Sequence, residues 1–185
     1  PLAIFFADVD RALSELDMAS QRFPELRLRV MGVGLGDAYR RSVSGDAMIV
    51  PGADALRAAG DDWDGSELPF YTCLALSRPN DDDGEPETPL FMDPSMAAAS
   101  LENARKQAEQ ANGGALSADV EARRQVVCTS LDKAVEIVLS GKESEVCGDS
   151  FGFVPPFRSI QFLRESGKAS SPAARAADMA AEAAK

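Results

Sequence analysis

Short apolar runs alternate with amphipathic segments along the chain, and they predict strands and helices in turn. Leu2–Phe6 is short, apolar and aromatic, as a buried strand is, and apolar residues at helical spacing follow it as far as Phe23. Leu26, Leu28 and Val30 alternate with arginines, which predicts a strand with one wet face. Strands alternating with helices predict an α/β or α+β class. The predicted strands cover residues 2–6, 26–30, 48–50, 69–76, 90–92, 125–128 and 151–154.

The same apolar blocks occur twice in the same order, with insertions in the second copy. The block at Leu2–Phe6 has a counterpart at Pro89–Met92, and both precede an alanine-bearing segment. A duplicated supersecondary unit predicts two pseudo-symmetric β-α repeats that share one core and form a two-lobed fold. The further pairs of blocks are Leu35–Tyr39 with Leu131–Val135, and Met48–Pro51 with Phe153–Pro155.

The predicted organisation has four parts. Residues 1–79 form the first repeat and residues 88–168 form the second. Residues 80–87 form an acidic loop between them, because a run of carboxylates has no means of packing. Residues 169–185 form an Ala-rich tail that we expect to be helical and to lie outside the core.

Composition narrows the classes of partner. Hydrophobic residues make up 45% of the 185 residues, which fits a folded chain, and the formal net charge is −11. This charge repels phosphate groups, so nucleic acid and anionic membrane surfaces are disfavoured as ligands. No stretch is apolar enough to span a bilayer, so we expect any membrane association to be peripheral.

The residues that usually carry catalysis are sparse. The sequence contains no histidine, which removes the commonest general base and the commonest metal ligand. Cys73, Cys128 and Cys147 form no CxxC pair, so a zinc site is not supported; a disulfide between Cys128 and Cys147 stays open. We therefore expect a protein that is not an enzyme, with no cofactor, no metal and no catalytic residues.

Three motifs resemble binding sites for metals or nucleotides. Asp8 and Asp10 follow an apolar strand, as in metal-dependent phosphatases and glycosyltransferases, but a helix cap explains them better. The glycines at Gly32, Gly34 and Gly36 lack the spacing of a dinucleotide fingerprint, which favours a simple strand-to-helix turn. The acidic loop at 80–87 lacks the ligand spacing of an EF-hand, which favours a solvated loop over a calcium site.

The aromatic residues remain as candidates for binding. Most are expected in the core, but two lobes that splay apart would expose some of them along an apolar groove that holds extended peptide. The candidate partner-binding residues are Phe70, Phe91, Phe153 and Phe157.

Taken in order, the blocks resemble a known family. Pro-Leu and Phe-Phe pairs precede an alanine-rich helix, Leu-x-x-Ala segments begin at Leu35 and Leu131, and Phe-Val-Pro-Pro begins at Phe153. Over roughly residues 1–166 this pattern is similar to the twenty-two-kilodalton import component of the chloroplast Tic translocon, which has cyanobacterial and apicoplast relatives. The resemblance implies a two-lobed α/β "butterfly" fold with hydrophobic pockets.

The resemblance also implies a function. A member of this family would be a non-enzymatic, chaperone-like component of plastid protein import that binds preproteins in the envelope intermembrane space. The acidic loop and the Ala-rich tail lie outside the family pattern and leave an alternative open. On that alternative the protein is an accessory or linker subunit of a plastid membrane complex, such as an algal photosystem at the thylakoid, on its stromal or lumenal side. Its partners are then either polypeptide clients or the subunits of such a complex.

Overall fold

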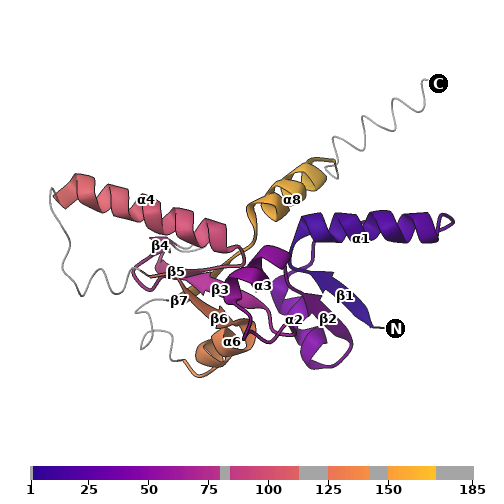
Figure 1. The fold of residues 1–185 in the computed structure, drawn as a ribbon, viewed down its shortest axis with the longest axis horizontal. Helices are drawn as coiled ribbons and strands as arrows, with labels where there is room; N and C mark the ends of the chain where they lie inside the picture. Colours follow the sequence, from indigo (N-terminus) through magenta and orange to yellow (C-terminus); the bar gives the residue numbers. More distant parts are fainter. Residues whose placement is uncertain (1, 80–83, 113–124, 142–149, 170–185) are drawn as a thin grey trace, which may run out of the picture.

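The computed structural model describes residues 2–79, 84–112, 125–141 and 150–169, and these form strands and helices of both kinds (Figure 1). The strands are β1 (Ala3–Phe6), β2 (Ala47–Val50), β3 (Pro69–Thr72), β4 (Arg78–Pro79), β5 (Pro86–Phe91), β6 (Val127–Ser130) and β7 (Ser150–Val154). The helices are α1 (Val9–Arg22), α2 (Leu35–Val43), α3 (Ala53–Ala59), α4 (Pro94–Asn112), α6 (Leu131–Leu139) and α8 (Phe157–Ala169).

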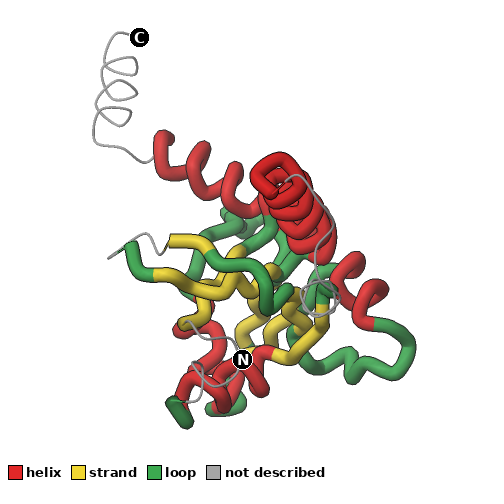
Figure 2. Tube along the Cα trace, turned by 90° about the vertical axis from the view of Figure 1, so that its left-hand side faces the viewer, coloured by secondary structure: helices red, strands yellow, loops and turns green. Residues whose placement is uncertain are grey.

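The strands form two sheets. In the smaller sheet β1 and β2 lie parallel, and Phe6 is the partner of Val50. In the larger sheet β5 pairs in parallel with β7 and antiparallel with β3 and β4, while β3 also pairs antiparallel with β6. Helices lie above and below the strands in both views (Figures 1 and 2). The mixed α/β class predicted from the sequence is confirmed.

The parallel strand pairs of the two halves are built alike. Phe6 pairs with Val50 in the first half, as Phe91 pairs with Val154 in the second. One residue further on, Ala7 N–H donates to the Val50 carbonyl oxygen at 3.0 Å, and Met92 N–H donates to the Val154 carbonyl oxygen, also at 3.0 Å. The blocks that the sequence repeats therefore occupy equivalent places in the two sheets.

Helices α2 and α6 also correspond. Each has nine residues and buries one alanine, Ala38 in α2 and Ala134 in α6. Each is followed by a glycine in the left-handed region, Gly45 with φ 78° and Gly141 with φ 64°. Other residues are strained in that region, so a glycine after the last turn stops the helix in both halves.

The core has two clusters, one on each face of the larger sheet, because successive strand residues point to opposite faces. Phe70 and Leu90 belong to one cluster, while their neighbours Tyr71 and Phe91 belong to the other. The first cluster packs against α6, with partly buried residues of α2 beside it. The second packs against α3 and α4 through Ala55 and Ala97. The larger sheet is thus covered by helices on both faces.

Two local predictions were wrong. The alternating segment around Leu28 was expected to be a strand, but residues 27–34 form no strand and pair with no other strand among the described residues. The acidic loop was expected to extend to Glu87, but β5 begins at Pro86, and Glu87 is buried against Arg78 with an ion pair of 2.6 Å. A paired carboxylate can be buried, which charge counting along the sequence does not reveal.

The boundaries of the predicted repeats stay a prediction. Strands β3 and β4 precede residue 80, yet they pair with β5 and complete the sheet of the second half. Residues 80–83 and the tail from residue 170 lie outside the described residues, and so does the predicted helical character of that tail.

Candidate functional site

An apolar groove with a cavity volume of about 850 Å³ opens beside the smaller sheet. Its floor and one wall come from β1, from Ile4 to Phe6, together with Ile49 of β2. The opposite wall is the segment Leu28–Val33, which joins α1 to α2. The groove therefore separates a strand edge from a segment that has no strand partner in the described structure.

Residues of three helices, α1, α2 and α8, also line the groove. Helix α1 contributes Ala12 and Leu16, one turn apart on the same helix face. Helix α2 contributes Leu35 and Ala38, and α8 contributes Ser159, Phe162 and Leu163. Because α1 and α2 both line it, the groove runs between two helical layers and is not a dimple on one face.

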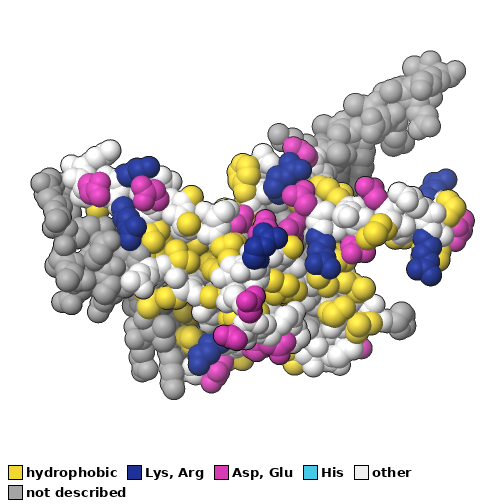
Figure 3. Space-filling view, viewed as in Figure 1, with side chains coloured by type: hydrophobic (Ala, Val, Ile, Leu, Met, Phe, Trp, Pro, Cys, Tyr) yellow, Lys and Arg dark blue, Asp and Glu magenta, His cyan; other side chains and the backbone are white. Residues whose placement is uncertain are grey.

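The groove exposes apolar side chains that a folded core would bury. Along Leu28–Val33, the exposed fraction is 61% for Met31 and 51% for Val33. Figure 3 shows hydrophobic side chains at the surface along the border between α1 and the β1–β2 sheet. A continuous apolar patch of this kind is typical of a surface that binds another molecule.

The chemistry of the lining favours an apolar, uncharged ligand segment. Only Glu15 and Arg29 among the lining residues carry a charge, and their charges are opposite. The hydroxyl of Ser159 and the main chain of β1 supply the other polar groups. Such a site suits extended polypeptide, which offers apolar side chains and main-chain hydrogen-bonding groups together.

The structure divides the four predicted partner-binding residues. Phe153 lines the groove, is 36% exposed, and makes a T-shaped ring contact with Phe70 at 5.2 Å between centroids. Phe157 is 55% exposed on α8 but is not among the groove residues. Phe70 and Phe91 are 0% and 6% exposed. They lie on inner strands of the larger sheet, so neither can touch a partner at the surface in this structure.

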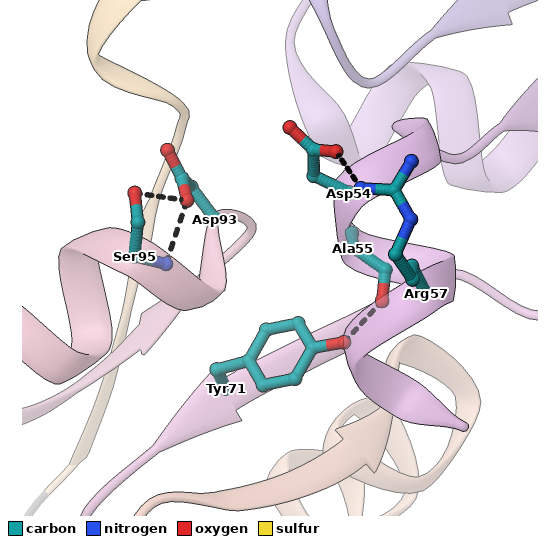
Figure 4. Close-up of polar contacts among 6 residues, drawn as sticks. All are labelled: Asp54, Ala55, Arg57, Tyr71, Asp93 and Ser95. Carbon is teal, nitrogen blue, oxygen red and sulfur yellow. Dashed lines mark hydrogen bonds and ion pairs between the residues drawn. The ribbon is translucent and has the colours of Figure 1, made fainter.

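Of the two carboxylates that suggested a metal site, Asp8 caps α1 by accepting from the main-chain N–H of Asp10 at 2.7 Å, and Asp10 forms an ion pair with Arg158 at 3.3 Å. Asp93 makes the same kind of contact at the start of α4, where it accepts from Ser95 N–H at 2.8 Å (Figure 4). The helix-cap interpretation of Asp8 is therefore confirmed. Among the described residues no group of three or more His, Cys, Asp or Glu residues could hold a metal ion.

A second, polar hollow lies where these helix starts converge. Asp8, Asp54 and Asp93 line it, and Arg57 forms an ion pair with Asp54 at 2.6 Å (Figure 4). In the same view the Tyr71 hydroxyl donates to the main-chain oxygen of Ala55, which ties β3 to α3. The contacts of these carboxylates and of Tyr71 support a structural role.

The glycines and cysteines considered in the sequence have structural surroundings in the fold. Gly34 caps α2, and Gly32 lies so close to Leu163 of α8 that a Cβ at Gly32 would overlap the Leu163 side chain. Cys73 is buried, and Cys128 is a free thiol whose pKa is raised by burial. Cys147, and with it the disulfide left open above, lies outside the described residues.

Sequence reasoning missed most residues of the groove. Ala12 and Leu16 follow helical spacing, so they look like ordinary core positions. Met31 and Val33 look like part of a strand-to-helix turn. The signal lies in the strand pairing, which the structure supplies: β3 lies beside β5, and no strand among the described residues takes the matching place beside β1.

Within the described part of the chain, no helix meets the length and hydropathy needed to cross a bilayer.

Comparison with known proteins gives matches only in structure. No protein-family model matches the sequence, and no curated protein matches it significantly. A solved structure of Tic22 from Plasmodium falciparum superposes with a TM-score of 0.53 and 14% identity, covering 92% of this chain and 84% of that chain. Anabaena Tic22, described as a protein of protein transport, gives a TM-score of 0.48 and 14% identity, covering 82% of this chain and 75% of that chain. The similarity to the Plasmodium structure shows that the chain has this fold, as the resemblance in sequence implied.

Proposed function

We propose that the protein is a non-enzymatic, chaperone-like component of plastid protein import that binds preproteins in the envelope intermembrane space. The observation that carries the proposal is the open apolar groove between β1 and Leu28–Val33. Its lining has few charges, so it would bind many polypeptides with low sequence selectivity. The fold shared with Tic22 from Plasmodium falciparum supports the import role and the plastid location.

The absence of histidine supports a role in binding over one in catalysis. The two carboxylates that most resembled a reactive pair are Asp8 and Asp10, and Asp8 is engaged in capping α1. Clients would be held by apolar contacts and main-chain hydrogen bonds, with no chemical change to either partner.

The experiment that tests this function is suppression of aggregation of a denatured client protein, with one pair of matched variants. Ala12→Lys places a charge inside the groove, while Ser14→Lys places the same side chain on the exposed face of α1. We expect Ala12→Lys to abolish suppression and Ser14→Lys to retain it, with both proteins folded by circular dichroism. Equal suppression by both variants would show that clients bind elsewhere.

The alternative, a linker subunit of a plastid membrane complex, predicts different results in the aggregation assay and in co-sedimentation with thylakoid complexes. A linker would co-sediment with thylakoid complexes and would not suppress aggregation. Its association would also weaken as salt rises, because an acidic protein would dock on a basic face. The fold shared with Tic22 from Plasmodium falciparum supports the import role, so the import role is kept.

A further inference from the structure

Strand β1 has one edge that pairs with no strand among the described residues, and this edge is called its free edge below. Its other edge is paired, since Ala3 N–H donates to the Asp46 carbonyl oxygen at 3.0 Å and Ala7 N–H donates to Val50 at the same distance. Main-chain groups alternate between the two edges of a strand, so the amides of Ile4 and Phe6 point away from β2. Strand β2 is the only strand that pairs with β1 in the part of the chain that is described. The free edge faces the groove.

The segment across the groove is the counterpart of a paired strand. Gly34 and Ser130 hold the N-cap positions of α2 and α6, and this aligns Met31–Val33 with Val127–Thr129 of β6. Strand β6 pairs along its length with β3. Met31–Val33 has no such neighbour among the described residues.

Strand β3 of the second half has no equivalent beside β1 among the described residues. Tyr71 lies between two strands, opposite Phe91 of β5 and opposite Cys128 of β6. By the correspondence of the halves, Phe91 matches Phe6 and Cys128 matches Gly32. Both Phe6 and Gly32 line the groove. The groove therefore lies where a strand equivalent to β3 would run.

Differences in burial between the two halves also indicate that a strand could fill the groove. In the second half Phe91 and Ala97 are buried at 6% and 0% exposure, and both belong to the cluster that contains Tyr71. Their counterparts, Phe6 and Ala12, are only partly buried and face the groove. The lining by α1 on one face and α2 on the other also fits a strand in the plane of the sheet, covered from both sides.

We propose that the groove binds a client by strand addition. One extended client segment would run antiparallel to β1 and to Met31–Val33, with an aromatic or other large apolar residue between Phe6 and Gly32. This proposal rests on the proposed function and adds the mode and register of binding. Main-chain hydrogen bonds would supply affinity for any sequence, and alternate side chains would enter the two apolar layers. The occupant is a segment of a partner polypeptide. In the second half the equivalent position is filled by β3 (Pro69–Thr72), so any extended apolar strand of that kind should fit the groove.

A synthetic peptide tests the mode of binding on the full protein. The probe is the sequence of residues 66–74 with Ser in place of Cys73, labelled for fluorescence anisotropy. A second peptide carries an N-methyl group on the amide of Tyr71, and a control peptide carries it on Glu67, outside the β3 sequence. Every amide of an inner strand points to one neighbour or the other, so the methyl group at Tyr71 should weaken binding at least about tenfold. The control should bind as the unmodified peptide does.

Hydrogen exchange supplies the second measurement. The amides of Ile4 and Phe6 should exchange fast in the free protein and slowly with the unmodified peptide bound. Equal binding of all three peptides, with unchanged exchange, overturns strand addition but leaves polypeptide binding in the groove. If the unmodified peptide does not bind but a denatured client does, strand addition is again overturned while polypeptide binding stands. If neither the peptide nor the client binds, the proposed function is overturned as well. Slow exchange at Ile4 and Phe6 in the free protein overturns the proposal too. It would mean that the chain itself fills the groove or, if the protection grows with protein concentration, that a second copy does.

Discussion

The hydroxyl of Tyr71 donates a hydrogen bond to the main-chain oxygen of Ala55, which holds β3 under α3. Both residues are buried. Tyr71→Phe removes the donor and leaves the oxygen of Ala55 with one partner fewer, so the free energy of unfolding should fall by about 1–2 kcal/mol. Urea denaturation measures the change. Tyr39→Phe, which removes an exposed hydrogen bond to Asp132, is the control and should cost less. An equal loss in the two variants would contradict the buried role of Tyr71.

Stability should fall at alkaline pH. Burial raises the pKa of Tyr71 and, together with the hydrogen bond and charge of Asp132, that of Tyr39. A raised pKa means that the unfolded chain loses the phenolic proton first, at a pH of about 10. The stabilisation is therefore complete below that pH and declines above it. Urea denaturation at about pH 8 and about pH 11 should show a smaller decline in Tyr71→Phe than in the parent protein. The same decline in both would show that Tyr71 does not contribute.

A side chain at Gly152 should destabilise the larger sheet. A Cβ there would overlap the buried carboxylate of Glu87, which is held by Arg78. Gly152→Ala should therefore cost about 1–3 kcal/mol, as overpacking does. Gly36→Ala is the matched control, because nothing lies within 4 Å of a Cβ there and α2 should gain about 0.5–1 kcal/mol from alanine. Thermal melts of both variants are the measurement, and a neutral Gly152→Ala would contradict the packing of Glu87.

Two phenylalanines on neighbouring elements should differ in client binding. Phe153 lines the groove, whereas Phe157 is exposed outside it. Phe153→Ser should weaken binding of a denatured client several-fold, because the groove loses a large apolar contact. Phe157→Ser should leave binding unchanged. The reverse order of effects in a fluorescence titration would move the site from the groove to the start of α8.

The sequence predicted local structure better than pairing. The short apolar run at residues 48–50 was enough to predict β2, which spans Ala47–Val50, because such a run is a local signal for a buried strand. Alternation around Leu28 predicted a strand wrongly, since a strand needs a neighbouring strand that alternation does not encode.

The candidate site was predicted only in part. An aromatic groove was inferred, and Phe153 is one of its residues. Phe70 and Phe91 were candidate partner-binding residues, and both are buried, because β3 and β5 lie inside the larger sheet. The order of the strands in the sheet decides which aromatic residues are buried. That order depends on pairing between residues far apart in the sequence, which local patterns do not reveal.

The most direct test of binding in the groove is site-specific photo-cross-linking. A benzoylphenylalanine at Met31, which is 61% exposed in the groove, is compared with one at Val43, which is 69% exposed on α2 and outside it. With a denatured client present, the groove site predicts a cross-linked product from position 31 and none from position 43. Equal cross-linking from both positions, or a product from position 43 alone, would contradict it.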